Sequence, residues 1–297
     1  MRIGTRRSAL ALAQAQLIVQ ALGGGEIVPI VTRGDRGATG EDKSRWVAEL
    51  EQALVAGEID LAVHSAKDVP GELGEGLSLH GAPARAPAED VICGSSGLQA
   101  LGAGARVGTS SIRRMAQLRA AREDLDVVSL RGNVDTRLRK LADPDEGLDA
   151  IVLARAGLER LGRASEIGGN LELGRFVPAP GQGILALEGR ADDARARAAV
   201  AAITDRVSFC ALRAERALAA ELAASCNTPL GAHAAPDGED GLLLSAWVGL
   251  PDGSAWVSDE LRGRLGQPEA LARLVAERLK LAGAGELLAR AEEIATA

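Results

Sequence analysis

The stretch "IDLAVHSAKDVPG" (residues 59–71) begins as an apolar run and ends in side chains that can do chemistry. A base, a hydroxyl, an ammonium and a carboxylate follow within five residues, on His64, Ser65, Lys67 and Asp68. Because the next proline disfavours the helical conformation before it, we expect Lys67 and Asp68 on an extended segment where a strand leaves its sheet. An ionised Asp68 there would stabilise a developing cation and relay protons; the alternative is a salt bridge at the strand end.

Arginines recur where a short strand is followed by a helical pattern. The four segments are "RIGTRRSALALAQ" (2–14), "RVGTSSIRRMAQLR" (106–119), "VVSLRGNVDTRLRK" (127–140) and "AIVLARAGLERLG" (150–162). A cation in the first turn of a helix opposes the helix dipole, at a cost of roughly a few tenths of a kcal/mol, so stability does not explain the pattern. Guanidinium groups beside helical N–H groups and capping hydroxyls bind carboxylates or phosphates. The pattern therefore predicts a ligand with several acidic groups, bound at the carboxyl ends of the strands.

The arginines assigned to this anion cleft are Arg6, Arg113, Arg114, Arg131 and Arg137. Solvated helix faces are the better explanation for Arg119, Arg122 and Arg139. A G+C-rich genome would explain why arginine outnumbers lysine, but not where the arginines fall. Nucleic acid is not expected as a partner, because the net charge is −7, aromatic residues make up 2%, and no nucleic-acid-binding motif is present.

The three cysteines stand in different contexts. Cys93 and Cys210 lie in an apolar strand and a helix, which is typical of small core residues. Cys226, in "ELAASCNTPLGAH", is expected in a turn, where a thiol could serve as a nucleophile or an attachment point. No metal site is predicted, because the histidines are scattered and the cysteines lack ligand spacing.

The chain of 297 residues is long for a single core, so two or three domains are expected. Strands alternate with helices up to about residue 200, which predicts parallel α/β sheets. The expected strands are 2–4, 27–31, 59–64, 90–94, 106–108, 127–130, 150–153 and 183–187. A linker is predicted at 80–90 and a second break at 177–183, both rich in proline or glycine.

Beyond residue 206 the pattern changes to a helix, two strands joined around Pro251, and two helices near 268–281 and 284–295. This order predicts a small α+β domain. No apolar run is long enough to span a membrane, and the apolar N-terminal stretch is typical of an amphipathic helix rather than a signal peptide. We therefore expect a cytoplasmic protein with no membrane partner.

Eight blocks of the sequence together resemble one known family. They are "RIGTRRSALALAQ", "VTRGD", "HSAKDVP", "VGTSSIRRMAQL", "SLRGNVDTRL", "AGLERLG", "PGQG" and "SCNTPLGAHA". The family is hydroxymethylbilane synthase, also called porphobilinogen deaminase. The resemblance implies two α/β lobes like those of periplasmic binding proteins, residues 1–84 with 182–203 and residues 88–178. It also implies a small α+β C-terminal domain, residues 206–297, in a monomeric protein.

The resemblance implies a transferase of tetrapyrrole biosynthesis, the route to porphyrins and heme. Four porphobilinogen molecules would be joined head to tail, with loss of ammonia, onto a covalently bound dipyrromethane. Hydrolysis would then release the linear tetrapyrrole hydroxymethylbilane. Cys226 matches the cysteine whose thioether holds the dipyrromethane, and Asp68 matches the catalytic aspartate.

Further matched positions would bind the acetate and propionate groups of cofactor and substrate. They are Arg6, Ser8, Lys67, Ser111, Arg113, Arg114, Arg131, Arg137 and Arg160, to which we add Ser129, Arg155 and Lys43. Where many relatives have a pattern like "GGKGLFVKELE", this chain has "GEDKSRWVAELE" (40–51), so Lys43 keeps one cation and Ala48 replaces another. A non-catalytic binding protein of the same two-lobed fold is the alternative; it would leave Cys226 and Asp68 without a purpose.

Overall fold

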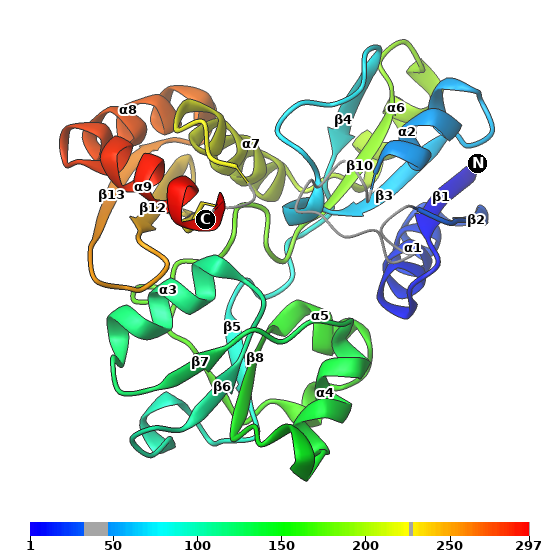
Figure 1. The fold of residues 1–297 in the computed structure, drawn as a ribbon. Coiled ribbons are helices and arrows are strands. Elements are labelled where there is room, and N and C mark those ends of the chain that lie inside the picture. The colour runs from blue at the N-terminus through cyan, green and yellow to red at the C-terminus, as the bar shows by residue number, and fades with distance from the viewer. Residues whose placement is uncertain (33–46, 226–227, 297) are drawn as a thin grey trace. The chain divides into compact units, whose positions relative to one another are not determined.

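The structure is a computed structural model that describes residues 1–32, 47–225 and 228–296. Lys43 and Cys226 lie outside these described residues. The chain forms two compact units, residues 1–86 with 181–213 and residues 87–180 with 214–297 (Figure 1). The boundaries of three separate domains remain a prediction.

The first unit is built on one five-stranded sheet, in the order β2-β1-β3-β10-β4. Its strands are β1 (Arg2–Arg6), β2 (Glu26–Ile30), β3 (Leu61–Ser65), β4 (Leu77–Gly81) and β10 (Leu185–Arg190). Its helices are α1 (Ala9–Ala21), α2 (Ala48–Val55) and α6 (Ala194–Ile203), and α7 (Arg206–Glu221) has residues in both units. Helices α1 and α6 share an apolar cluster with one face of the sheet. Helix α2 packs on the opposite face.

The second unit contains another five-stranded sheet, in the order β7-β6-β8-β5-β9. Its strands are β5 (Asp90–Cys93), β6 (Arg106–Gly108), β7 (Asp126–Val128), β8 (Ala150–Ala154) and β9 (Gly169–Asn170). Its helices are α3 (Ile112–Ala121), α4 (Val134–Ala142) and α5 (Arg155–Arg160). Alternate residues of β8 point to opposite faces, so Val152 meets the cluster that includes Leu118 of α3, and Ile151 meets the one that includes Leu138 of α4.

The same unit also holds a three-stranded antiparallel sheet, in the order β11-β12-β13. Its strands are β11 (Leu230–Pro236), β12 (Gly241–Gly249) and β13 (Trp256–Arg264), with β13 at one edge. Helices α8 (Pro268–Leu281) and α9 (Ala284–Thr296) contact this sheet. The predicted α+β character of the C-terminal region is confirmed, as are the two strands around Pro251 and the two final helices.

All eight predicted strands of the α/β region are present, but the prediction of parallel sheets was wrong in part. Strand β10 runs antiparallel to β3 and β4, and β5 runs antiparallel to β8 and β9. Two consecutive strands of one sheet run parallel when a helix crosses between them. β5 and β10 each follow a strand of the other sheet, so that rule does not fix their direction. The predicted linker at 80–90 is also shorter than expected, because β4 continues to Gly81.

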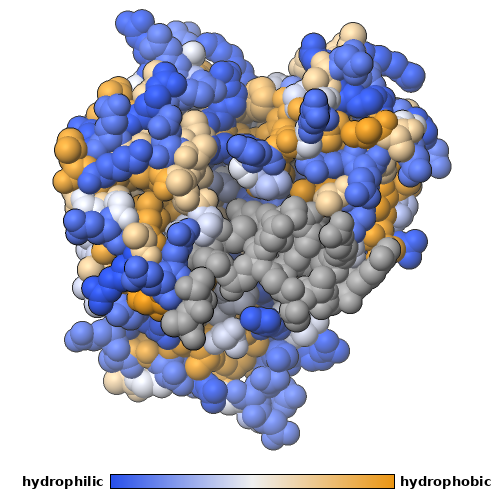
Figure 2. Space-filling view, turned by 45° about the horizontal axis from the view of Figure 1, so that its top comes forward, coloured by the Kyte–Doolittle hydropathy of each residue, from blue (hydrophilic) through white to orange (hydrophobic). Residues whose placement is uncertain are grey.

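Within the described residues, no helix is long and apolar enough to cross a membrane. Among the coloured residues of the face seen in Figure 2, hydrophilic side chains are interspersed with hydrophobic patches. Cys93 and Cys210 are buried, as expected, and burial raises the pKa of the Cys93 thiol to about 11.

Candidate active site

The turn that follows β3 carries Lys67 and Asp68. It is a short 3-10 helix, Ala66–Asp68, closed by a hydrogen bond from the Val69 N–H to the Ala66 carbonyl at 3.2 Å. The expectation of an extended segment was therefore wrong for Lys67 and Asp68. It holds for Val69, whose φ of −77° and ψ of 130° are extended. The restriction imposed by proline acts only on the residue immediately before it, so the two preceding residues are able to turn.

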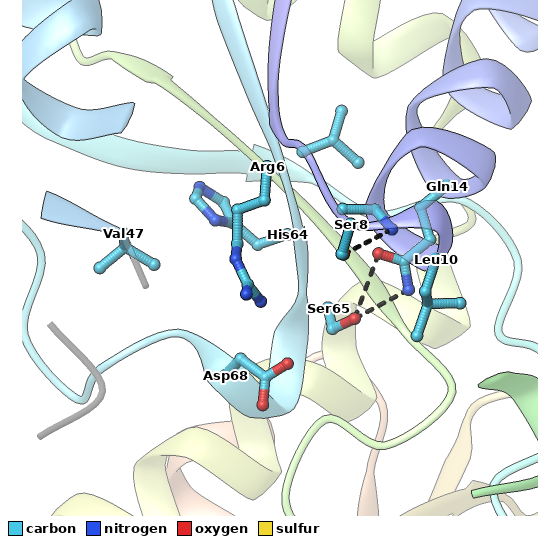
Figure 3. A pocket seen from close by; sticks show the side chains of 10 residues that line it. Arg6, Ser8, Leu10, Gln14, Val47, His64, Ser65 and Asp68 are labelled. Carbon is cyan, nitrogen blue, oxygen red and sulfur yellow. Dashed lines mark hydrogen bonds between the residues drawn. The ribbon is translucent and has the colours of Figure 1, made fainter. Parts of the chain in front are cut away.

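A pocket lies beside this turn, in the first unit. It is lined by Arg6, Ser8, Leu10, Ala11, Gln14, Val47, Val63, His64, Ser65 and Asp68. Figure 3 shows the guanidinium of Arg6 and the carboxylate of Asp68 pointing toward one another. Three of the residues assigned from sequence, Arg6, Ser8 and Asp68, thus meet in one pocket. Together they offer a cation, a hydroxyl and a carboxylate to a small polar ligand.

The wall of this pocket opposite Arg6 is held by hydrogen bonds. Ser8 is the N-cap of α1, and its hydroxyl accepts from the Ala11 N–H at 3.3 Å. The amide of Gln14, one turn further along α1, exchanges hydrogen bonds with the hydroxyl of Ser65, of 2.8 Å and 3.2 Å (Figure 3). Helix α1 and strand β3 are therefore joined across the pocket by polar side chains, which fixes where Ser8 and Asp68 stand.

A buried pair of titratable groups lies next to the pocket. His64 Nε2 and Glu188 Oε2 are 2.8 Å apart, and the two side chains are 3% and 0% exposed. In the register of β3 and β10, Glu188 pairs with Ala62, so the pair joins two adjacent strands on one face. Burial raises the pKa of nearby Glu51 on α2, and the charge of Glu188 adds to that rise. The pair is best explained as a polar link that fixes the end of β3, where the reactive turn begins.

A second group of assigned residues lies at the start of α3, in the second unit. Ser111 caps the helix through the Arg114 N–H. Asp90 Oδ2 accepts from Arg113 Nη2 at 2.7 Å, and Asp90 Oδ1 accepts from Arg114 Nε at 2.9 Å. Arg113 also donates to the Val177 carbonyl. The two guanidiniums, the carboxylate and their partners are buried, so this part of the predicted cleft is a packed ion cluster in which two guanidiniums share one carboxylate.

Arg137 extends the positive charge of this cluster. Its Nη2 donates to the Ser110 hydroxyl at 2.7 Å. Burial lowers its pKa to about 10, and the charge of Arg114 contributes to the shift. Among the described residues, the Nε atoms of Arg113 and Arg137 are buried without a hydrogen-bond partner. Burial likewise lowers the pKa of Arg160 to about 10, against the attraction of Glu159. Cations that have lost water in this way favour an anionic ligand.

Other predicted residues are less closely grouped. Ser129 and Arg131 are exposed on the segment between β7 and α4. Arg155 donates from Nε to Glu159 Oε1 at 2.7 Å within α5, and this hydrogen bond raises its pKa. Arg119, which we expected on a solvated helix face, instead donates to the Pro251 and Val127 carbonyls. It therefore links α3 to the turn between β12 and β13.

Asp90, Gln14 and Glu188 contribute to these groups and were not predicted from the sequence. Asp90 stands 23 positions before Arg113, and Glu188 stands 124 positions after His64. The only local signal was a charged or polar residue inside an otherwise apolar strand or helix. Such a residue requires a buried partner, but the sequence does not indicate which one.

Two family models together match most of the chain. The family model described as "Porphobilinogen deaminase, dipyromethane cofactor binding domain" matches residues 1–198. The model described as "Porphobilinogen deaminase, C-terminal domain" matches residues 209–281.

Curated relatives match along almost the whole chain. A porphobilinogen deaminase from Roseiflexus sp. (strain RS-1) is 44% identical over 301 residues, which is 97% of this chain and 98% of the relative. One from Brevibacillus brevis is 42% identical over 302 residues, covering 97% and 96%. Among solved structures, a periplasmic substrate-binding protein of an ABC transporter from Coxiella burnetii matches with a TM-score of 0.41 and 15% identity. That match covers 68% of this chain and 91% of the other.

Proposed function

The chain belongs to the porphobilinogen deaminase family, and from this membership we propose that it makes hydroxymethylbilane from porphobilinogen. Four porphobilinogen molecules are condensed head to tail on a bound dipyrromethane, each with loss of ammonia, and the tetrapyrrole is released by hydrolysis. The observation that carries this proposal is the agreement along 97% of the chain with enzymes of that name. The pocket with Arg6, Ser8 and Asp68 supports it.

In this proposal Asp68 acts at the reacting centre. Loss of ammonia from porphobilinogen leaves a positive charge spread over the pyrrole ring, and a carboxylate that accepts the ring N–H stabilises that charge. The nearby guanidinium of Arg6 binds a substrate carboxylate, with Ser8 and Lys67 as further partners. Arg6 and Asp68 thereby hold the acidic groups and the reacting ring of one substrate in a fixed relation.

The second unit offers the groups that would hold the dipyrromethane. A dipyrromethane built from two porphobilinogen units carries four carboxylates, and the buried Arg113 and Arg114 together with the half-buried Arg137 fit them in charge. The buried Nε atoms of Arg113 and Arg137 have no protein partner among the described residues, as expected of donors reserved for a ligand. We assign Ser111, Ser129, Arg131, Arg155 and Arg160 to the same role. When bound, the dipyrromethane would supply the free α-carbon of its terminal pyrrole, to which the first new unit is joined; each later unit joins the pyrrole added before it.

Cys226 and Lys43 complete the proposed site on the strength of the family resemblance. Cys226 is the attachment point, through a thioether, and Lys43 is a further cation for substrate carboxylates. We also propose that the protein is a cytoplasmic monomer and binds no nucleic acid. Its net charge of −7 and its aromatic content of 2% support the last point.

Intact mass spectrometry of the purified protein tests this function. We expect an excess mass that matches two linked pyrroles in the wild-type protein and no excess in Cys226→Ala. Incubation with porphobilinogen should yield hydroxymethylbilane from the wild type only. A wild-type protein of unmodified mass that produces no tetrapyrrole would instead favour a non-catalytic binding protein with the same fold.

A further inference from the structure

The segment 181–184 packs directly against the turn that carries Lys67 and Asp68. The N–H of Ala66 donates to the Ile184 carbonyl at 3.0 Å, just beyond the ladder between β3 and β10. Gly181 has a φ of +78°, and a Cβ placed on it would lie 2.9 Å from the Ala66 carbonyl carbon and the Lys67 nitrogen. This close approach requires glycine at position 181, and the reactive turn therefore rests on the backbone of this segment.

Gln182 reaches the turn with a polar side chain. It is 1% exposed, and its Oε1 accepts from Lys67 Nζ at 3.4 Å. Its backbone carbonyl accepts from Arg85 Nε at 2.8 Å, and the neighbouring Gly183 carbonyl accepts from the Ala86 N–H at 3.2 Å. The amide of Gln182 thus extends from a fixed stretch of backbone and meets the end of a long, flexible side chain.

We propose that Gln182 is a positioning residue that holds the ammonium of Lys67 for substrate carboxylates with a neutral acceptor. A lysine side chain loses considerable rotamer entropy when it is fixed. A buried hydrogen-bond partner orders the side chain before the substrate arrives, so less of this entropy is lost on binding. An amide oxygen does so without cancelling the positive charge. A carboxylate at the same position would also hold Lys67, but it would neutralise the charge that attracts the acidic substrate.

This inference rests on the proposed function, because it assigns Lys67 to substrate carboxylates. Two substitutions distinguish the loss of the hydrogen bond to Lys67 from the addition of a negative charge beside it. Gln182→Met keeps the length of the side chain and removes the amide, whereas Gln182→Glu keeps the shape and adds a negative charge. We expect each to raise KM for porphobilinogen, by about tenfold, while kcat stays within about twofold.

The second readout does not depend on activity. The chain has four lysines, and Lys280 on α8 is exposed, so it serves as an internal reference for acetylation of Lys67 by acetic anhydride. Peptide mass spectrometry gives the two rates as a function of pH. We expect faster acetylation of Lys67 in Gln182→Met, since its amine loses an acceptor that stabilises the ammonium, and slower acetylation in Gln182→Glu, since a carboxylate stabilises it further.

Opposite changes in the acetylation rate of Lys67 together with equal rises in KM would support the positioning role. If Gln182 had a purely structural role, both substitutions would change the acetylation rate in the same direction. His80→Gln is the matched control: His80 hydrogen-bonds to the Arg190 carbonyl on the same sheet, away from the turn, and its replacement should change neither readout. Wild-type acetylation and KM in both Gln182 variants would overturn the proposal.

Two further results keep the test decisive. If one Gln182 variant does not fold, the other variant still tests the proposal. A wild-type acetylation rate of Lys67 together with a wild-type KM in that variant would overturn it. If the wild type makes no hydroxymethylbilane while acetylation responds to both substitutions as expected, the proposed function fails and the holding of Lys67 by Gln182 stands.

Discussion

Lys67 in the first unit and the pair of Arg113 and Arg114 in the second unit are held by different kinds of partner. In the first unit Lys67, which is half-buried, donates to the neutral amide of Gln182. In the second unit Arg113 and Arg114, which are 5% and 6% exposed, donate to the carboxylate of Asp90. A cation that water still reaches needs only a hydrogen-bond acceptor, whereas two adjacent guanidiniums removed from water need a counter-charge.

The difference has a consequence for what each group offers a ligand. The amide of Gln182 holds Lys67 without adding a negative charge beside it. In the cluster of Asp90, Arg113 and Arg114, the carboxylate neutralises part of the positive charge and thereby stabilises the fold. Four substitutions are expected to change stability and activity in different proportions. They replace Asp90, Asp68, Arg137 and Arg155.

The largest effect is expected for Asp90→Asn. Asparagine keeps an acceptor but removes the negative charge of Asp90, so two buried guanidiniums lose the carboxylate that they share. We expect the free energy of unfolding to fall by about 3–5 kcal/mol, measured by urea denaturation. Asp124→Asn is the control, because Asp124 forms an exposed pair with Arg122, and its loss should change stability far less. Equal stability of Asp90→Asn and Asp124→Asn would show that the buried arginines do not need the carboxylate of Asp90 as a counter-charge.

Asp68→Asn should affect the reaction and spare the fold. We expect porphobilinogen to bind while kcat falls by about a hundredfold to a thousandfold, since the carboxylate that stabilises the developing cation is gone. Steady-state kinetics and urea denaturation of the same preparation would show both results. Normal turnover would refute the role of Asp68.

Arg137→Gln should separate function from stability in the second unit. Burial lowers the pKa of Arg137 to about 10, so the charged side chain costs free energy in the folded protein near neutral pH. We expect the free energy of unfolding to stay the same or rise by about 1 kcal/mol, while less of the protein carries the dipyrromethane by intact mass. A less stable variant with full loading would place Arg137 among the structural cations.

The smallest effect is expected for Arg155→Gln. Arg155 is partly exposed and already paired with Glu159 one turn along α5, an arrangement that contributes about 0.3–0.5 kcal/mol. We expect a loss of stability of that size and a rise in KM smaller than that caused by Arg137→Gln. A larger rise in KM would show that Arg155 leaves Glu159 when a substrate carboxylate arrives.

Local patterns in the sequence located the elements of the fold well. Apolar runs gave the α/β strands, and polar caps such as Ser8, Ser111 and Asn133 stand where α1, α3 and α4 begin. Three strands were missed. β9 has two residues, β4 is an edge strand of intermediate burial, and β11 follows a turn rich in small and polar residues. Strand direction was missed where consecutive strands belong to different sheets, because no crossover helix then sets it.

The candidate site was predictable in its residue types but not in its pairings. The motifs around Asp68 and Arg113 indicated a reactive carboxylate and an anion site. Asp90 and Gln182, which hold Arg113 and Lys67, are 23 and 115 positions away from them. Such partners are set by sheet order and register, which a single sequence does not contain.

Strand β13 lies at the edge of its sheet and is nine residues long, which would ordinarily invite another copy to add a strand. Its exposed positions include Glu260, Arg262 and Arg264, and Asp259 pairs with Arg278 of α8. Adding a strand there would pull these ionic groups out of water. The charged side chains therefore oppose edge-to-edge pairing of β13 with another copy. We expect concentrated preparations not to aggregate through this edge as long as these charges are kept.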